Sequence, residues 1–437
     1  MSQKATIALI LVLGAGVHLT ELTTPNEVIF DEFHFGKFAT HYCCNHQRFF
    51  DVHPPHPKLL IAGLGWLGGY RGEYNFGQIG QRYPNKKILF LRLLPAVIGT
   101  LIPLVFFLLL SEIGVSLGGS FLGALCLAFD NGLVVQTRAV LLDGFLVFSV
   151  LASIVCFSRA LRAQSALNRW ILVLAAGVFV GLAVGTKVLG LSVFAVLGMM
   201  LIEHWLLERE HWGRWVLMAT IVFVAFLGSY LLGWYFHYKL LTLPGPGDAW
   251  YVPTGHFFAD LLTVHKHMFS ANITLRAEHV YSSPWWSWPL MLKPIYYWQG
   301  GGGASIYFIG NPAVWWGGFL LFALTFMTVA WKGMRNFVSA DKKLWLPLLG
   351  YLTAFLPYAI ITRVMFLYHY LVPLCFALAT GILWLDGYSG LKDTIRSKIY
   401  FIIGAVVVFF FLLLSPITFG FKVPPTYWHF LSKVFLR

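Results

Sequence analysis

Two adjacent carboxylates, Asp31 and Glu32, follow the first apolar run of the chain, in the sequence Asp-Glu-Phe-His-Phe-Gly. Carboxylates beside apolar surface are costly to desolvate, and ionisable groups at membrane depth are usually functional. Neighbouring residues point in different directions, so one carboxylate can face a cavity while the other pairs with structure. A carboxylate in a half-dry cavity can take a proton from a hydroxyl group. We therefore expect Asp31 and Glu32 to be catalytic; a solvated turn is the alternative.

A proline-rich segment follows at residues 51–58. It contains His53, Pro54, Pro55, His56, Pro57 and Lys58. The prolines hold the backbone in a rigid extended or turning form, which fixes the His and Lys side chains beside them. Two histidines could ligate a metal, but prolines frame such a site poorly and no matching Cys/His set follows. We expect this segment to anchor the loop against a membrane or to line a pocket for an anionic group.

Three cations stand alone in short turns between apolar runs: Arg138, Lys187 and Arg363. A guanidinium fork is suited to holding a phosphate, so we expect the three to converge near one cavity that takes an anion. In a structural alternative, Arg138 is neutralised by Asp130 or Asp143. Snorkelling to lipid headgroups is the alternative for each cation.

The carboxylates, the cations and an aromatic-rich stretch at residues 281–298 together suggest transfer chemistry on a lipid-borne anionic substrate. The phosphate would be the leaving group, stabilised by fixed cations, and a carboxylate would assist the incoming hydroxyl as a base. For the aromatic stretch, a belt at the membrane surface is the alternative to sugar or lipid stacking.

Membrane spans must position these residues. Of the 437 residues, 58% are hydrophobic and only 11% are charged, and the mean hydropathy is +0.72, which excludes an ordinary soluble enzyme. We predict an all-α polytopic membrane protein with a single domain over residues 1–437. Its eleven expected spans, each of about 20 residues, are 5–22, 88–111, 117–136, 139–158, 171–186, 188–208, 214–236, 312–331, 344–362, 365–385 and 399–418.

Charge predicts the orientation of these spans. With a cytoplasmic N-terminus, two long segments, residues 23–87 and 237–311, lie outside. The inside connections then carry thirteen cations, whereas the three short outside turns carry one each, as the positive-inside bias requires. The thirteen inside cations are Lys4, Arg159, Arg162, Arg169, Arg209, Arg214, Lys332, Arg335, Lys342, Lys343, Lys392, Arg396 and Lys398. The formal net charge of +13 is therefore a topological feature and indicates no nucleic-acid partner.

Two smaller features complete the outside segments. The run from Lys58 to Gly69 is too short to span and is expected to form an interfacial helix on the outer leaflet. Cys43 and Cys44 are adjacent, a spacing that suits neither an ordinary mutual disulfide nor a zinc knuckle, so no disulfide framework is expected.

Seven motifs in order resemble those of the protein O-mannosyltransferase family, a GT-C class of membrane glycosyltransferases. They cover nearly the whole chain: Asp31-Glu32-x-His34-Phe35-Gly36, Asp51-Val-His53-Pro54-Pro55 with Lys58, Arg138-x-x-Leu-Leu-Asp143, Gly185-Thr-Lys187-Val-Leu-Gly190, Tyr281-Ser-Ser, Tyr307-Phe-Ile-Gly-Asn311-Pro312 and Phe366-Leu-Tyr368-His369-Tyr370. Each motif alone is weak, but the ordered set is specific.

The resemblance implies an eleven-span GT-C fold and inverting transfer of mannose from a polyprenyl-phosphate (dolichyl-phosphate type) donor to Ser/Thr hydroxyls of proteins. By the resemblance, Asp31 matches the acceptor-activating carboxylate with Glu32 in support, and Arg138 matches the arginine that meets the donor phosphate. Lys187 and Arg363 are expected to help bind that phosphate. The residues expected to line the substrate cleft are His53, Pro54, Pro55, Lys58, Tyr368 and His369.

The chain departs from the family pattern in two places. Residues 237–311 leave no room for the MIR domain of eukaryotic members, which favours a compact bacterial type in the plasma (inner) membrane, with its active site on the extracytoplasmic face; a eukaryotic chain would lie in the endoplasmic reticulum. The usual Leu-Gly after His-Pro-Pro is here His56-Pro57, which affects the loop's fine structure. No cofactor is firmly expected beyond the lipid donor, the need for a divalent metal is left open, and the resemblance permits dimers.

Two other functions remain as alternatives. The same donor class could serve a lipid or cell-wall glycan acceptor, because nothing in residues 237–311 indicates a peptide groove. A transporter of an anionic substrate would also use buried cations and a carboxylate, but it predicts matching halves with broken helices, which the sequence does not show.

Overall fold

The computed structural model describes residues 2–436 except 208–211, 275–278, 336–341 and 388–389. Within that part of the chain, eight helices are long and apolar enough to cross a membrane, and a bent pair adds a ninth span. Six of them are the single helices α4 (Ile88–Glu112), α7 (Asp143–Arg162), α8 (Ala166–Val184), α10 (Trp212–Leu240), α12 (Pro312–Arg335) and α15 (Asp393–Phe419). The other two include the 3₁₀ turn that precedes the helix: η2 (Val188–Leu191) with α9 (Ser192–Leu207), and η8 (Leu367–Tyr370) with α14 (Leu371–Gly387).

Two shorter apolar helices occupy the remaining predicted spans. They are α1 (Gln3–His18) and α13 (Lys342–Phe355), which continues into the 3₁₀ turn η7 (Leu356–Ile360). Each of the eleven apolar runs predicted from the sequence therefore contains helix, and the all-α membrane fold is confirmed. The span expected from residue 139 begins instead at Asp143, which places its carboxylate in the first turn of α7, where negative charge is favourable.

The predicted span at residues 117–136 is bent. Helices α5 (Leu117–Ala128) and α6 (Asn131–Thr137) meet at 58°. At the bend, the Asp130 carboxylate caps α6 by accepting from Leu133 N at 2.8 Å. It also accepts from Asn311 N at 2.9 Å and from Trp315 Nε1 at 2.8 Å. Asp130 therefore joins the bend to the start of α12 and is not the partner of Arg138.

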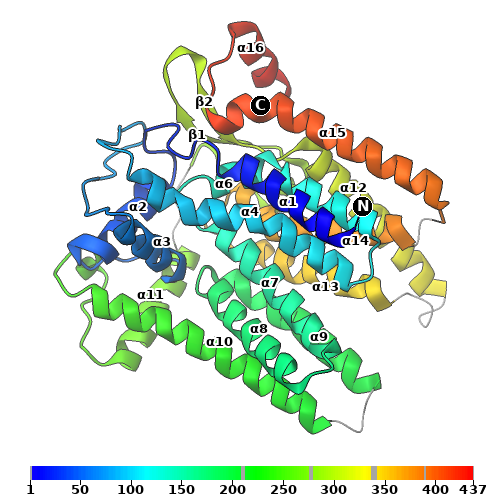
Figure 1. Ribbon diagram of the computed structural model, residues 1–437. Coiled ribbons are helices and arrows are strands. Elements are labelled where there is room, and N and C mark those ends of the chain that lie inside the picture. The colour runs from blue at the N-terminus through cyan, green and yellow to red at the C-terminus, as the bar shows by residue number, and fades with distance from the viewer. Residues whose placement is uncertain (1, 208–211, 275–278, 336–341, 388–389, 437) are drawn as a thin grey trace.

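The two long segments, residues 23–87 and 237–311, gather at one end of the helices, named here the loop end (Figure 1). Helix α3 packs on α4 and α10, and α11 packs on α10. The elements between the spans are α2 (Glu32–Thr40), the π-turn η1 (His41–Asn45), α3 (His56–Leu67), η4 (Pro246–Ala249), α11 (Phe257–Thr274), η5 (Trp285–Leu290), β1 (Ile295–Gln299), η6 (Gly301–Gly303), β2 (Ser305–Phe308) and the C-terminal α16 (Pro425–Val434).

Helix α3 has the properties expected of an interfacial helix. It is 12 residues long, too short to span. One face is buried against the bundle, whereas Leu60, Trp66 and Leu67 are 47%, 50% and 75% exposed. Exposed apolar side chains on a short helix are stabilised by lipid rather than by water.

The aromatic stretch at residues 281–298 lies partly in the core, so it is not simply a surface belt. Strands β1 and β2 form an antiparallel pair in which Ile295 lies opposite Phe308, with a bulge between Tyr296 and Trp298. Trp288 and Tyr297 are fully buried, and Trp286 is exposed. The belt interpretation fails for these buried rings: Tyr297 is held in the paired strand β1, and Trp288 lies in the 3₁₀ turn η5, where its ring packs against Tyr358 and His369.

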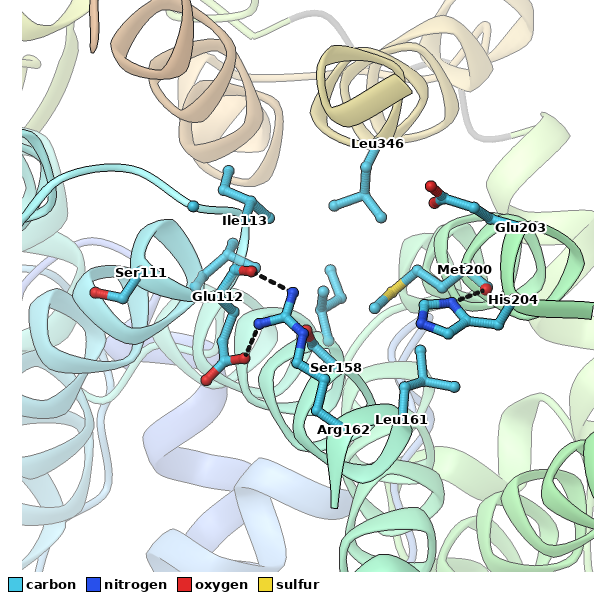
Figure 2. A pocket seen from close by; sticks show the side chains of 13 residues that line it. Ser111, Glu112, Ile113, Ser158, Leu161, Arg162, Met200, Glu203, His204 and Leu346 are labelled. Atoms are coloured by element: carbon cyan, nitrogen blue, oxygen red, sulfur yellow. Dashed lines mark hydrogen bonds and ion pairs between the residues drawn. The ribbon is translucent and has the colours of Figure 1, made fainter. Parts of the chain in front are cut away.

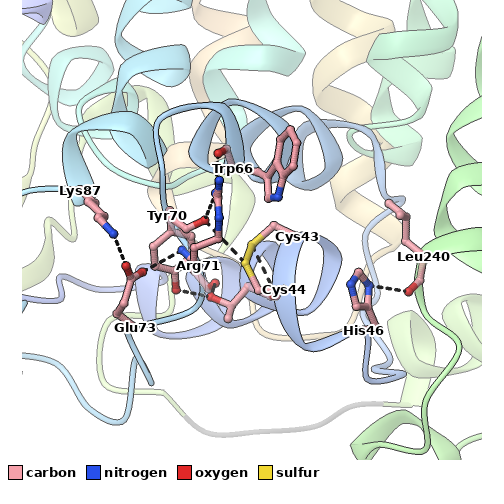
Figure 3. Close-up of a disulfide and its surroundings, with 11 residues drawn as sticks. Cys43, Cys44, His46, Trp66, Tyr70, Arg71, Glu73, Lys87 and Leu240 are labelled. Carbon is pink, nitrogen blue, oxygen red and sulfur yellow. Dashed lines mark hydrogen bonds and ion pairs between the residues drawn. A yellow bond between two sulfur atoms is a disulfide. The ribbon is translucent and has the colours of Figure 1, made fainter.

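A disulfide joins Cys43 and Cys44, contrary to the sequence-based expectation (Figure 3). Their Cα atoms are 3.8 Å apart, closer than in an ordinary disulfide, which is why the spacing argued against a bond. Both residues lie in the π-turn η1, and His46 beyond it has the left-handed φ of 54°. The conformation that brings the sulfur atoms together is a property of this turn, which the spacing of the two residues does not reveal.

Candidate active site

Asp31 stands at the loop end, at the start of α2. Its side chain is half-buried, and its carboxylate makes no hydrogen bond with any residue that the structure describes. The pKa of Asp31 is raised to about 7, chiefly by burial and also by the negative charges of Asp143 and Asp51, while the positive charges of Lys187 and Arg363 oppose the rise. A carboxyl group with this pKa, free of partners, is able to take up and release a proton near neutral pH.

Glu32 occupies the opposite environment. Its carboxylate is fully buried and pairs in a bidentate manner with Arg92, through Nε–Oε1 and Nη2–Oε2 contacts of 2.7 Å each. It also accepts from Ile29 N at 3.1 Å, from the Tyr83 hydroxyl at 3.0 Å and from Val140 N at 3.0 Å. All acceptor sites of Glu32 are therefore in use, so its role is to hold α2 and hence Asp31 in place.

Arg92 is a site residue that the sequence analysis missed. Besides Glu32, its guanidinium donates to the carbonyls of Leu22, Pro25 and Glu27 at 2.9–3.0 Å. It thereby ties α4 to the segment that leads into α2. The available signal was an arginine inside a predicted span, where an ionisable group needs a partner.

A chain of buried polar groups runs behind Asp31. Lys187 Nζ donates to Asp143 Oδ1 at 2.6 Å, and Gln136 Nε2 donates to Asp143 Oδ2 at 2.7 Å. The Tyr297 hydroxyl donates to Gln136 Oε1 at 2.5 Å. The Lys187 ammonium lies 5.0 Å from the centre of the Tyr368 ring. These contacts fix Lys187, so its charge acts on Asp31 without a direct ion pair.

Aromatic rings flank the residue before Asp31. Phe30 stacks on Tyr297 with ring centres 4.1 Å apart, and Tyr368 meets Phe30 edge-on at 6.3 Å. Tyr368 in turn stacks on His369 at 4.7 Å. The predicted cleft residues Tyr368 and His369 thus lie in the same cluster as Asp31 and Lys187.

The proline-rich loop is held by Lys58. Its ammonium pairs with the carboxylate of Asp51 and donates to the His53 carbonyl at 2.8 Å, and Lys58 is 1% exposed. Burial holds the pKa of His53 well below its ordinary value, and the positive charge of Lys187 lowers it further, so the ring is neutral. Lys58 therefore shapes the loop, and its place in the substrate cleft stays a prediction.

The departure at His56-Pro57 has a packing explanation. The His56 ring fills a notch made by two glycines: an added Cβ would lie 2.1 Å from His56 Nδ1 at Gly185 and 2.3 Å from Cε1 at Gly233. His56 Nε2 also contacts the Ser229 carbonyl at 2.9 Å. His56 is therefore committed to joining α3 to α8 and α10.

Of the three predicted phosphate-binding cations, two lie near Asp31 and the third, Arg138, lies at the end of α1. Lys187 and Arg363 both act electrostatically on Asp31, and Arg363 is held by Asn272 Oδ1 of α11 at 2.5 Å. Arg138 instead donates to the last carbonyls of α1 and the following turn and lies over the Phe419 ring at 4.6 Å. Its acceptors are Val17 O, His18 O, Thr20 O and Glu21 O.

Neither carboxylate proposed as a neutralising partner binds Arg138, because Asp130 and Asp143 have the partners described above.

No group of three or more His, Cys, Asp or Glu side chains in the described ranges is placed to hold a metal ion. The site is thus a half-buried carboxylate with two fixed cations and an aromatic wall. This arrangement can accept a proton from a hydroxyl while stabilising an anionic leaving group.

The fold places the chain among GT-C membrane glycosyltransferases. It matches a structure of the S. cerevisiae protein O-mannosyltransferase Pmt1-Pmt2 complex bound to the sugar donor, with a TM-score of 0.88 and 19% identity over 96% of this chain and 90% of that one. It matches ArnT from Cupriavidus metallidurans bound to undecaprenyl phosphate with a TM-score of 0.56 and 16% identity, over 100% of this chain and 77% of that one. At these identities the likeness shows the fold.

The sequence defines the family. The chain matches the model of dolichyl-phosphate-mannose-protein mannosyltransferases over residues 8–243 and that of the C-terminal four-span region of protein O-mannosyltransferases over residues 257–433. It therefore belongs to the protein O-mannosyltransferase family, as the ordered motifs predicted.

Two curated relatives are the dolichyl-phosphate-mannose–protein mannosyltransferases 4 of Candida albicans and Schizosaccharomyces pombe. They are 36% identical over 259 residues and 34% identical over 266 residues, respectively. Each alignment covers 56% of this chain, but only 34% and 33% of the relatives, so the chain spans about a third of their length.

Proposed function

We propose that this protein transfers mannose from a polyprenyl-phosphate donor to Ser/Thr hydroxyls of proteins. The observation that carries the proposal is the half-buried Asp31 carboxylate, free of hydrogen bonds in the described structure, beside Lys187 and Arg363 in a fold that matches a protein O-mannosyltransferase. The family match supports the donor and acceptor classes.

In the proposed step, the acceptor hydroxyl oxygen attacks C1 of the mannose while the bond from C1 to the phosphate oxygen breaks. The hydroxyl proton passes to Asp31, and the lipid phosphate leaves with the bonding electrons, so the configuration at C1 inverts. Lys187 and Arg363 stabilise the charge that develops on the phosphate. Arg138 is included as a donor-binding residue because it matches the arginine of the family motif. Its contacts in the structure hold the end of α1.

The proposed orientation puts the loop end on the extracytoplasmic side of the plasma membrane. The support is the cation count, because the short connections at the opposite end carry the excess of Lys and Arg. A pair of chains is also proposed, by likeness to the yeast complex.

The decisive experiment uses purified protein, polyprenyl-phosphate mannose and a Ser/Thr-rich peptide in detergent. Asp31→Asn removes the base and is expected to lower transfer by at least about 100-fold while the protein still folds. Asp248→Asn, which alters a loop carboxylate paired with Arg48, is the matched control and is expected to retain activity. Full activity in Asp31→Asn would overturn the proposed role.

The same assay separates the alternatives. Donor consumption in detergent, where no gradient exists, would rule out a transporter. Transfer to a glycan or lipid acceptor but not to the peptide would favour the other acceptor class.

A further inference from the structure

A cavity of about 290 Å³ (Figure 2) is lined by residues at the helix ends opposite the loop end. Helices α4, α7 and α9 end there and α13 begins nearby, and each contributes lining residues. Because these are the ends of membrane spans, the cavity lies at the depth of lipid headgroups.

One wall of the cavity carries positive charge. The Arg162 guanidinium donates to Glu112 Oε2 at 2.9 Å and to the Glu112 carbonyl at 2.6 Å. Arg159 Nε donates to Glu112 Oε1 at 2.9 Å. Two arginines therefore share one carboxylate, and this group has one positive charge in excess.

The opposite wall carries a carboxylate that has no cation partner among the described residues. Glu203 of α9 lies across the cavity from Arg162 (Figure 2) and makes no ion pair or hydrogen bond within the described chain. The C-terminal ends of α4, α7 and α9 add partial negative charge to the same region. A cation bound beside Glu203 would compensate both.

Two further polar groups are available to a ligand. The Ser158 hydroxyl lines the cavity without a hydrogen-bond partner among the described residues, although Ser158 is only 5% exposed. His204 uses Nδ1 on the Met200 carbonyl at 3.0 Å, and its other ring nitrogen has no hydrogen-bond partner in the described part of the chain. The rest of the lining is apolar and includes Leu109, Ile154 and Leu346.

We propose that this cavity binds a phosphoethanolamine group, with the ammonium at Glu203 and the phosphate at Arg162 and Ser158. A small ligand with an anion at one end and a primary ammonium at the other matches the two walls in charge. The same group occurs in the headgroup of phosphatidylethanolamine and in free phosphoethanolamine. The proposal concerns the end of the molecule away from Asp31 and is independent of the proposed transferase activity.

The test is the thermal stability of the purified full chain in detergent micelles that contain phosphatidylethanolamine, phosphatidylcholine or phosphatidylglycerol. Near saturation, phosphatidylethanolamine is expected to raise Tm by about 2–4 °C. Phosphatidylcholine should not, because its methylated ammonium donates no hydrogen bond to Glu203, and phosphatidylglycerol has no ammonium. Equal shifts with all three lipids would overturn the proposal.

The matched variants are Glu203→Gln and Ile202→Ala. Glu203→Gln should weaken the response to phosphatidylethanolamine about tenfold in lipid concentration and leave the lipid-free Tm unchanged. Ile202 is the adjacent residue, 57% exposed, and its variant should respond like the wild type. An undiminished response in Glu203→Gln would contradict the assignment.

A final arm distinguishes the two sources of the ligand. If free phosphoethanolamine, added without phosphatidylethanolamine, gives the same Tm shift and the shift depends on Glu203, the cavity takes the soluble compound. If only the phospholipid acts, and again through Glu203, the cavity is a headgroup site. Both results support the proposed chemistry.

Discussion

At the scale of single residues, the neighbouring carboxylates Asp31 and Glu32 are placed in opposite environments. Glu32 satisfies five donors and is buried beside Arg92, whereas Asp31 has no such donor within the described structure and an elevated pKa. Because consecutive residues at a helix start point in different directions, one can support the element while the other faces the cluster of Lys187, Tyr368 and His369. This geometry gives Glu32 a supporting role and leaves Asp31 as the candidate base.

The pKa of Asp31, about 7, predicts a pH-dependent rate. Below that pH the carboxyl is protonated and cannot act as a base, so kcat/KM for mannose transfer should fall about tenfold per pH unit below pH 6 and reach a plateau above about pH 8. Initial rates across this range, with stability confirmed at each pH, provide the measurement. A flat profile would contradict the assignment of Asp31 as the base.

Glu32→Gln tests the supporting role. Removing one partner of a buried ion pair leaves the Arg92 charge uncompensated, which typically costs about 3–5 kcal/mol. We expect a large fall in Tm in detergent and a matching loss of folded protein. Glu73→Gln, which alters the more exposed pair with Lys87, is the control and should change Tm little. Wild-type stability with lost activity would instead indicate that Glu32 acts directly in the reaction.

At the scale of elements, the start of α3 is held by the ring of His56, which packs against two glycines of neighbouring helices. His56 occupies the notch between Gly185 at the end of α8 and Gly233 within α10. This packing fixes the start of α3, and Lys58 then fixes the preceding loop through Asp51. The position of His53 beside the Asp31 cluster therefore depends on a contact between three helices.

Gly185→Ala tests this packing of His56 against the two glycines. The new Cβ would overlap His56, and overpacking of this kind typically costs about 1–3 kcal/mol. We expect a lower Tm and reduced transfer, with partial recovery of both in the double variant Gly185→Ala/His56→Ala. Gly228→Ala in α10, where an added Cβ meets nothing within 4 Å, is the control. Lack of recovery in the double variant would refute the proposed fit.

At the scale of the whole molecule, the two ends of the bundle carry different sets of charged and polar groups. The loop end holds the carboxylate, the fixed cations and the aromatic cluster. The opposite end holds the cavity between Arg162 and Glu203 and the short cation-rich connections. The spans separate the proposed transferase site from the proposed phosphoethanolamine site.

Cysteine accessibility tests the orientation. An impermeant maleimide should label Gly301→Cys, in the hairpin at the loop end, from outside intact cells, and Ser165→Cys, between α7 and α8, only after lysis. Cys43 and Cys44 are joined and Cys126 and Cys375 are buried, whereas the free Cys156 is half-buried, so labelling of the unsubstituted chain is subtracted as background. The reverse labelling pattern would invert the proposed topology.

The sequence alone determined the membrane class, the eleven apolar helices and the family, because hydropathy and ordered motifs are local properties of the chain. It also singled out Asp31, Lys187 and Arg363, since charged residues stand out in the sequence beside apolar runs. Only the tertiary structure decided that Glu32 is bound by Arg92, that Arg138 holds the end of α1, that His56 fills a glycine notch and that Cys43 bonds Cys44. Except for the disulfide, which depends on the conformation of one turn, these outcomes depend on partners that are distant along the chain. Which partner meets a charged or bulky side chain is set by helix packing, and sequence spacing does not encode it.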